Sequence, residues 1–459
     1  MAFSQIKYDT DYTKQIVSWV KNLKYEDIPP MVVDRVKMFM IHCCGVSLCA
    51  KDIKGMQKAI EIAKEISPGK EGDATLWGDG AKVSPEAALF AASAMADCLD
   101  WEDCAITGHP TAGVIPTAVI MGEALHKSGK EVLTAAVAAY EAYLRISLAG
   151  RSGISSYNIF GNLTLLMKLM DLDEEKMNQL YGIGCTMAST PANVHELTMS
   201  DSLNFIYGLR GNECVTALRI VMSGIENLED GFDIPYVYYN HCAYYKPEIL
   251  TMDLGTRWML MDSLLMKHHP GNMFVQTYEE IAHRLLAKYH FKAEDIGEVI
   301  IRPSIAFRNW YTKTGYKSIT QAQFSIPYTV AVALTYEEPG AKWYSDETMN
   351  DPKIIELLNK VKADGFVDVK GLDVLKDLMD GKHPEKHIIV RMKDGTEYED
   401  SLFTHPGHPN YMLTREEVVE RFKLETKYVL APETADKFIE TALKYDQLDD
   451  VAELPKYIY

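Results

Sequence analysis

Apolar residues recur at helical spacing through roughly the first 250 residues of the chain, which predicts a body of packed helices. The first such group is Ile16, Val17, Val20 and Leu23. Two later helices begin with recognisable capping residues: Ser84-Pro85-Glu86 before an alanine-rich run, and Ser128 with Glu131 before the run Val132–Leu148. Because alanine-rich helices can pack closely, this part of the chain is expected to be a multi-helix bundle.

The pattern changes after residue 262, where short runs typical of strands alternate with helices. Helices are expected at residues 273–289, 322–336 and 354–361, and strands at 298–302 and 387–392. Asp394-Gly395 predicts a hairpin after the second strand, and helices return at 414–424 and 433–445. We therefore predict a mainly α fold, with an all-helical domain from residues 1–262 and 404–459 and an inserted α+β domain at 263–403.

The charge of the chain narrows its possible partners. Its 459 residues include 47 basic and 65 acidic side chains, a formal net charge of −18. This balance argues against binding to a nucleic-acid backbone, although a few cations in a pocket could still hold an anionic small molecule. No signal peptide or membrane span is apparent, and none of the eight cysteines forms a C-x-x-C pair. We expect a cytoplasmic protein with reduced cysteines and no nucleic-acid or membrane partner.

The densest polar cluster follows the alanine-rich run and precedes a histidine. Its members are Asp97, Asp100, Glu102, Asp103 and His109. Four carboxylates are costly to bury unpaired, so some of them must face solvent, cations or a ligand. His109 beside them is a candidate general acid or base, because an imidazole titrates near neutral pH. The alternative is an acidic helix end with a capping histidine.

A second candidate cluster, Lys267-His268-His269-Pro270, lies at the boundary between the two patterns. Lys267 there could hold a carboxylate in a cleft between domains, or the segment could be a solvated hinge. A third histidine-rich segment, His405-Pro-Gly-His408, indicates a rigid turn rather than a metal site. The sequence has no nucleotide-binding glycine motif, no G-x-S-x-G elbow and no H-E-x-x-H motif. Chemistry by acid/base side chains alone, without a cofactor or metal, is therefore expected.

Several segments together resemble the MmgE/PrpD family over nearly the whole chain. They are Ser84-Pro-Glu-Ala-Ala-Leu89, Leu99-Asp-Trp-Glu-Asp103, His109-Pro110 through Pro116, Lys267-His-His-Pro270, Gln321-Ala-Gln-Phe-Ser-Ile-Pro-Tyr328 and Asp351-Pro-Lys-Ile354. The resemblance implies a helical domain built from both chain ends, an inserted α+β lid domain, a homodimer and no cofactor. It also implies a small carboxylate as substrate.

The resemblance assigns roles to three residues. His109 matches the family's His-Pro histidine, Asp100 the first acid of its Leu-Asp-aromatic-Asp-Asp motif, and Lys267 its lysine at the lid boundary. In the reactions of this family a proton leaves or joins a carbon next to a carboxylate. His109 would be the acid or base, Asp100 its orienting partner, and Lys267 the cation that stabilises negative charge on the substrate.

The chain also departs from the family pattern. An expected aromatic-His-Pro is replaced by the segment ending at Tyr157, and an expected lysine is missing from Ser202–Gly208. Cys104 stands where the family has threonine, and Asn272 where some members have histidine. We expect Cys104, Asn272 and Tyr157 to contact substrate. Fewer cations should weaken binding of a tricarboxylate, so a less anionic substrate is expected.

Three functions are compatible with these residues. The first is a lyase of the dehydratase or hydratase type that acts on a carbon next to a carboxylate. The second uses similar proton transfer but ends in isomerisation, epimerisation or decarboxylation. The third is a non-catalytic binding protein whose pocket has lost its activity.

Overall fold

The computed structural model describes residues 8–68, 72–105, 108–150, 158–188, 199–225, 227–234, 245–305, 310, 316–367, 382 and 384–459. The α-helices are α1 (Tyr12–Asn22), α2 (Pro30–Ala50), α3 (Lys54–Ile66), α4 (Pro85–Cys98), α5 (Thr111–Ala124), α6 (Gly129–Ala149), α7 (Asn158–Leu169), α8 (Glu174–Met187), α10 (Ser202–Met222), α12 (Met259–Asp262), α13 (Gln276–Tyr289), α14 (Ile319–Gln323), α15 (Ile326–Ala333), α16 (Asp346–Met349), α17 (Pro352–Leu358), α19 (Arg415–Thr426) and α20 (Pro432–Leu443). The strands are β1 (Ala74–Thr75), β2 (Lys82–Val83), β3 (Asp103–Cys104), β4 (Leu265–Met266), β5 (Ile296–Arg302), β6 (Val361–Ala363), β7 (Lys386–Met392) and β8 (Glu397–Leu402). The predicted mainly α fold is confirmed.

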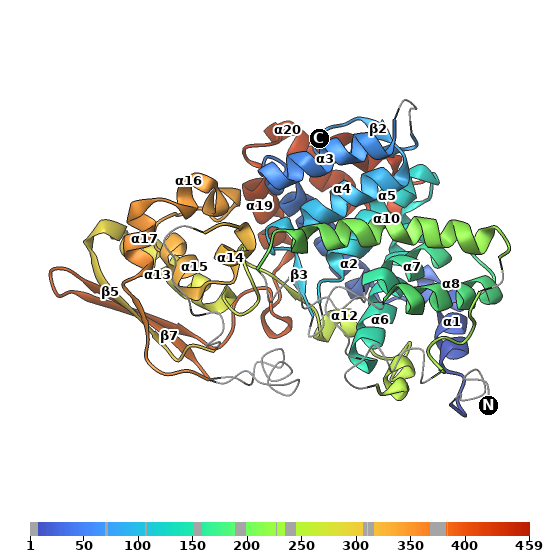
Figure 1. The fold of residues 1–459 in the computed structure, drawn as a ribbon, viewed down its shortest axis with the longest axis horizontal. Helices are drawn as coiled ribbons and strands as arrows, with labels where there is room; N and C mark the ends of the chain where they lie inside the picture. Colours follow the sequence, from blue (N-terminus) through green and yellow to red (C-terminus); the bar gives the residue numbers. More distant parts are fainter. Residues whose placement is uncertain are drawn as a thin grey trace.

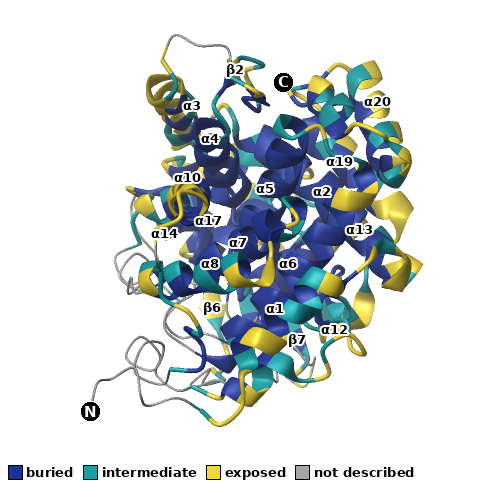
Figure 2. Ribbon diagram, turned by 90° about the vertical axis from the view of Figure 1, so that its right-hand side faces the viewer, coloured by how far each residue is buried: buried dark blue, intermediate teal, exposed yellow. Residues whose placement is uncertain are grey.

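The centre of the helical body is formed by helices that are buried on nearly every side. In α5 every residue from Thr111 to Glu123 is buried, and α2, α4, α6 and α7 surround it (Figure 2). Small residues allow close approach: a Cβ at Gly208 of α10 would lie 2.4 Å from the carbonyl oxygen of Phe90 on α4. The alanine-rich segments are therefore the closely packed centre of the fold.

Helices from the end of the chain return to this body. The helices α19 and α20 both pack against α2, and Figure 1 shows them beside the N-terminal helices. Both chain ends thus contribute to one helical region, while the division at residues 262/263 and 403/404 stays a prediction. By length and composition α6 could cross a membrane, but 94% of its most apolar window is buried inside the protein, as in a core helix.

A four-stranded sheet lies on the other side of the molecule, in the order β6-β5-β7-β8 (Figure 1). β5 pairs parallel with β6 and antiparallel with β7, and β7 and β8 form the predicted hairpin at Asp394-Gly395. α13 packs on β7 and β8, and α15 packs on β6, so helices cover this sheet. The strand expected at 298–302 lies within β5.

Three local predictions need correction. The helix expected over 322–336 is broken, because the Ser325 side chain accepts a hydrogen bond from the backbone of Tyr328 and Pro327 follows at the start of a new helix, α15. The helix expected to reach Val361 ends at Leu358, and Val361 begins β6. Ser84 stands at the N-cap position of α4, but its side chain makes no capping hydrogen bond. The capping box at Ser128 and Glu131 is present as predicted.

The cysteines of the described residues are free thiols. Six of the eight cysteines in the sequence are buried and Cys49 is half-buried, whereas Cys242 lies outside the described residues. Buried thiols among apolar side chains agree with the packing role expected for them.

Candidate active site

A short strand pair joins Lys267 to the acidic motif, by which we mean the four carboxylic acids Asp97, Asp100, Glu102 and Asp103. β3 pairs antiparallel with β4, with Asp103 opposite Met266. Continuing this register by one residue places Lys267 opposite Glu102, although the two segments are far apart in sequence. The turn at 405–408 packs against the same strand, since Met266 donates its backbone N–H to the carbonyl of Gly407 at 2.9 Å. The strand pair therefore positions the two predicted clusters beside each other.

Lys267 and Asp100 form a buried ion pair. Lys267 is fully buried, and its ammonium group donates a hydrogen bond to Oδ1 of Asp100. Burial lowers the pKa of Lys267, but the carboxylates of Asp100 and Glu102 outweigh burial and raise it above its ordinary value. Asp100 has a φ of +49°, in the left-handed region that aspartate tolerates better than most residues. This backbone turn points the carboxylate toward Lys267.

His109 is held by the acidic motif through its Nδ1 atom. Nδ1 lies 2.7 Å from the carbonyl oxygen of Asp103 and 3.0 Å from Oε1 of Glu102, but 3.9 Å from Oδ1 of Asp100. The prediction that Asp100 orients His109 is therefore corrected: Glu102 is the nearer carboxylate, because Asp100 turns toward Lys267. The Nζ atom of Lys267 lies 3.3 Å from the same nitrogen. The sequence predicted that these residues lie together, but not that Asp100 pairs with Lys267 and Glu102 with His109.

The charge of His109 follows from these neighbours. Burial and the Lys267 ammonium lower its pKa, but the carboxylates of Glu102 and Asp100 outweigh them and raise the pKa of His109 to about 9. At neutral pH the imidazole is therefore protonated. Its Nε2 atom makes no hydrogen bond with the described residues, and 14% of the side chain is exposed. His109 can thus present an Nε2–H to a substrate as a general acid.

Asp103 fixes the start of the next helix. Its Oδ2 atom accepts hydrogen bonds from the backbone of Thr111, at 3.0 Å, and from the Thr111 hydroxyl. That hydroxyl lies 2.8 Å from the hydroxyl of Tyr140 on α6. Burial and the nearby Glu102 raise the pKa of Asp103 to about 7. The contacts of Asp103 are those of a residue that supports the His109 loop.

Of the three predicted substrate contacts, the structure describes Cys104 and Asn272. Cys104 is buried in β3, with Sγ 3.4 Å from Sδ of Met273, and burial raises its pKa well above the ordinary value for a thiol. Asn272 accepts the backbone N–H of Phe274 at 3.2 Å, so its amide oxygen is used within its own turn. Tyr157 lies outside the described residues. The structure brings together Asp100, His109 and Lys267, and the substrate roles of the other three stay predictions.

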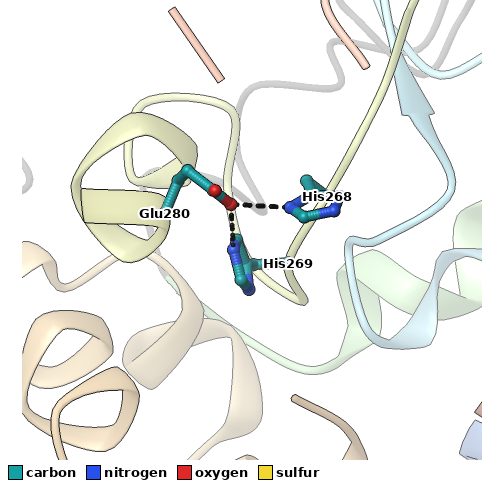
Figure 3. A group of neighbouring side chains, drawn as sticks. All are labelled: His268, His269 and Glu280. Carbon is teal, nitrogen blue, oxygen red and sulfur yellow. Dashed lines mark hydrogen bonds and ion pairs between the residues drawn. The ribbon is translucent and has the colours of Figure 1, made fainter. Parts of the chain in front are cut away.

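The histidines after Lys267 are held by a carboxylate on α13. Figure 3 shows Glu280 between the two imidazoles: Nδ1 of His268 lies 2.7 Å and Nε2 of His269 lies 2.9 Å from the same oxygen, Oε2. Gln276, one turn earlier, accepts the backbone N–H groups of both histidines at 3.0 Å. Sequence reasoning missed Glu280 and Gln276, although their spacing of four places both on one helix face. Together they fix the segment that follows Lys267.

His268 is half-buried and His269 is buried, and both are held in the neutral form. Burial, and after it the Arg421 guanidinium, lowers the pKa of His268 to about 3, and burial lowers that of His269 to about 4. Below about pH 6.5, the pKa of an unfolded histidine, these two imidazoles bind protons in the unfolded chain but stay neutral in the folded protein. Their contribution to stability is therefore present at neutral pH and is lost as the pH falls from about 6.5 toward 4.

We expect His269→Phe to reduce the acid sensitivity of folding. Phenylalanine keeps the stacking of this ring on Trp343, whose plane lies within 6° of it, but cannot titrate. Between about pH 7.5 and pH 5, the variant should lose about 2 kcal/mol less of its unfolding free energy than the wild type does. Denaturant unfolding at both pH values measures the difference. His126→Asn, at an exposed histidine, is the control, and equal losses in wild type and His269→Phe would contradict the assignment.

Two groups of side chains place donor atoms close enough to meet on one metal ion. They are His268, His269 and Glu280, and Asp97, Glu102 and His109. In the first group the donors are already hydrogen-bonded to one another, and the nearby Arg421 guanidinium opposes a divalent cation. In the second, the Lys267 ammonium lies 3.3 Å from the His109 ring. The first group therefore fits a hydrogen-bonded acid/base cluster, and the ammonium beside the second group disfavours a metal ion there.

Family models cover most of the chain. The MmgE/PrpD N-terminal domain matches residues 14–247, and the MmgE/PrpD C-terminal domain matches residues 269–447. The chain belongs to the MmgE/PrpD family. Lys267 lies in the short segment between the two matched regions, and Asp100 and His109 lie in the first.

Relatives in this family match the chain over most of its length at low identity. The cis-aconitate decarboxylase of Mus musculus is 21% identical over 97% of this chain and 93% of its own length, and that of Homo sapiens is 20% identical over 96% and 93%. A cis-aconitate decarboxylase of Aspergillus terreus is 23% identical over 76% and 78%. The chain is thus a divergent member of a family that includes decarboxylases.

Proposed function

We propose that this protein is a cofactor-independent lyase that transfers a proton to or from a carbon next to a carboxylate. The observation that carries the proposal is the arrangement of His109, whose Nδ1 is held by Glu102 and whose Nε2 is left without a partner among the described residues. Lys267 beside it supplies a buried positive charge. This is the pairing of a proton donor and a cation that such a reaction requires.

Of the outcomes open to such a site, decarboxylation has the best support, because the relatives are named as decarboxylases. In that reaction the bond between the carboxylate carbon and its neighbour breaks, and CO₂ leaves. The electron pair stays on the neighbouring carbon, and the Nε2 proton of His109 is transferred to it. Lys267 stabilises the negative charge that develops before the proton arrives.

We further propose that the substrate carries fewer than three carboxylates. Among the described residues of the cluster, the two cations already contact carboxylates of the protein, Lys267 that of Asp100 and His109 that of Glu102. A substrate carboxylate must compete with these partners, and each additional charge would bring another anion toward a buried acidic cluster. The proposal includes a homodimer, as the family resemblance implies, and a cytoplasmic location, as the sequence led us to expect.

The proposal predicts which carboxylates the protein turns over. Mono-, di- and tricarboxylates with a double bond next to the carboxylate, including cis-aconitate, would be incubated with the protein, and products followed by NMR together with CO₂ release. We expect turnover of a mono- or dicarboxylate in preference to cis-aconitate. Fastest turnover of cis-aconitate would contradict the substrate assignment. Binding in a thermal-shift assay without any product would favour a non-catalytic binding protein.

A further inference from the structure

The acidic motif places more carboxyl groups together than the neighbouring cations can balance. Asp97, Asp100, Glu102 and Asp103 are all buried, with exposed fractions of 8% or less. Among the described residues, the cations that contact them are Lys267 and His109. Burial lowers the pKa of Arg35 and the charge of Asp103 partly opposes this, so the two groups are near each other. However, the Arg35 guanidinium donates its hydrogen bond to the carbonyl of Leu264 and lies over the ring of Phe39. Two carboxylates would be left unbalanced if all four were ionised.

Partners identify the carboxyl group that keeps a proton. Asp100 is paired with Lys267, Glu102 with His109, and Asp103 accepts two hydrogen bonds from Thr111. These partners stabilise the charged form of each group. The carboxyl group of Asp97, in the last turn of α4, has no hydrogen bond or ion pair with any described residue, although its backbone carbonyl accepts the N–H of Asp100 at 2.8 Å. The charged form of Asp97 is therefore the least stabilised of the four, and this carboxyl group is the one that stays protonated.

Asp97 nevertheless faces the proton-transfer group. One of its carboxyl oxygens lies within 4.8 Å of both a Glu102 oxygen and a ring nitrogen of His109. The residue is buried, with 5% of its surface exposed. The carboxyl group of Asp97 is thus within a few ångströms of the imidazole that the proposed function places at the substrate.

We propose that Asp97 is a second catalytic acid of this site, a neutral carboxylic acid that donates its proton to the substrate. The inference rests on the proposed function and adds to it the group that supplies a second proton. An isomerisation starts from the minority of molecules in which His109 is neutral: Nε2 takes a proton from one carbon while Asp97 delivers its own proton to another, which leaves His109 protonated and Asp97 ionised. The site would thereby support isomerisation of a carboxylate as well as decarboxylation.

The charges that face Asp97 agree with this assignment. Burial and the Glu102 carboxylate raise the pKa of Asp97 well above its ordinary value, and Asp100 adds to them, against the opposing effects of His109 and Lys267. Tyr207 on α10 lies near Asp97, since burial and, after it, the charge of Asp97 raise the pKa of the tyrosine. The ring of Tyr207 is edge-on to that of His109, with 6.1 Å between the ring centroids. By contrast, Lys267 and His109 outweigh burial at Glu102 and lower its pKa. Two neighbouring carboxyl groups with opposite shifts are typical of an acid and a charged partner.

Infrared spectroscopy tests the proton directly, without a substrate. In protein labelled with ¹³C-aspartate, the wild-type spectrum at about pH 8 is expected to contain a protonated carboxyl band that Asp97→Asn lacks, since Asp103 is largely ionised at that pH. Asparagine has the same shape and cannot donate an acidic proton. Asp52→Asn, at an exposed aspartate, should retain the band. A wild-type spectrum with no band that depends on Asp97 would overturn the proposal whatever the activity.

Kinetics then tests the catalytic role. On any unsaturated mono- or dicarboxylate that the wild type turns over, Asp97→Asn is expected to lower kcat by about 10²-fold with little change in KM. Ser93→Ala, one turn earlier on α4, is the control for packing. Unchanged kcat in Asp97→Asn would overturn the role of Asp97, whereas no turnover by the wild type on any probe would contradict the proposed function itself.

Discussion

Replacing His109 with asparagine is expected to lower turnover by about 10²- to 10⁴-fold, the usual contribution of a general acid or base. An asparagine amide at this position can still donate to the carbonyl of Asp103 and approach Glu102, as Nδ1 of the imidazole does. It cannot supply a proton at the position of Nε2. The variant should therefore bind a substrate with nearly unchanged KM while kcat falls.

Steady-state kinetics on a substrate that the wild type accepts measures this effect. His126→Asn is the control, because it makes the same chemical change at a histidine whose side chain is 74% exposed. Circular dichroism of both variants shows whether the fold is retained. Wild-type turnover in folded His109→Asn would remove His109 from the proposed mechanism.

Replacing Lys267 with methionine is expected to affect both activity and stability. The variant loses the cation that stabilises negative charge on the substrate, which should lower kcat by about 10²- to 10³-fold. It also leaves the buried carboxylate of Asp100 unpaired, and breaking a buried ion pair typically lowers the unfolding free energy by about 3–5 kcal/mol. Both effects arise from one ammonium group that is completely buried.

A double-mutant comparison separates these two effects. Asp100→Asn removes the unpaired charge and retains a residue that tolerates the positive φ at this position. The pair Asp100→Asn/Lys267→Met should therefore regain part of the stability lost in Lys267→Met, but none of the activity. Denaturant unfolding and kinetics measure the two quantities. Equal stability of Lys267→Met and the wild type would show that the pair contributes nothing to folding.

Local patterns were enough to predict most of the fold. The helices around Ile16 and after Ser128, and the hairpin at Asp394-Gly395, follow from spacing and capping residues within a few positions of each other. The predictions that failed depended on tertiary context. The apolar run from Ala322 continues across Pro327, and only the hydrogen bond at Ser325 shows that the chain starts a new helix there.

The candidate site was predicted in its members but not in its pairings. Sequence reasoning placed Asp100, His109 and Lys267 together through the family resemblance, and the structure brings them into contact. The short ladder between β3 and β4 determines which carboxylate meets which cation, and no local pattern reveals a two-residue strand. The pairing of Glu102 with His109 could therefore be found only from the structure.

The same limit applies to buried charge. The sequence shows four acidic residues close together but not that all four are buried, nor that Asp97 is left without a partner among the described residues. In the structure two cations contact these four carboxyl groups, and from this imbalance we infer that one of the groups is a neutral acid. The prediction that some carboxylates face solvent, cations or a ligand therefore could not single out Asp97 as a second catalytic group.

The central claim is that His109 governs proton transfer at a carbon next to a carboxylate. It is tested most directly by running the reaction in D₂O and locating deuterium in product and recovered substrate by NMR. For decarboxylation, isomerisation or hydration alike, we predict deuterium at the reacting carbon with the wild type and at least about 10²-fold slower incorporation with His109→Asn. Product formed without deuterium on carbon, or labelled equally fast by His109→Asn, would contradict the claim.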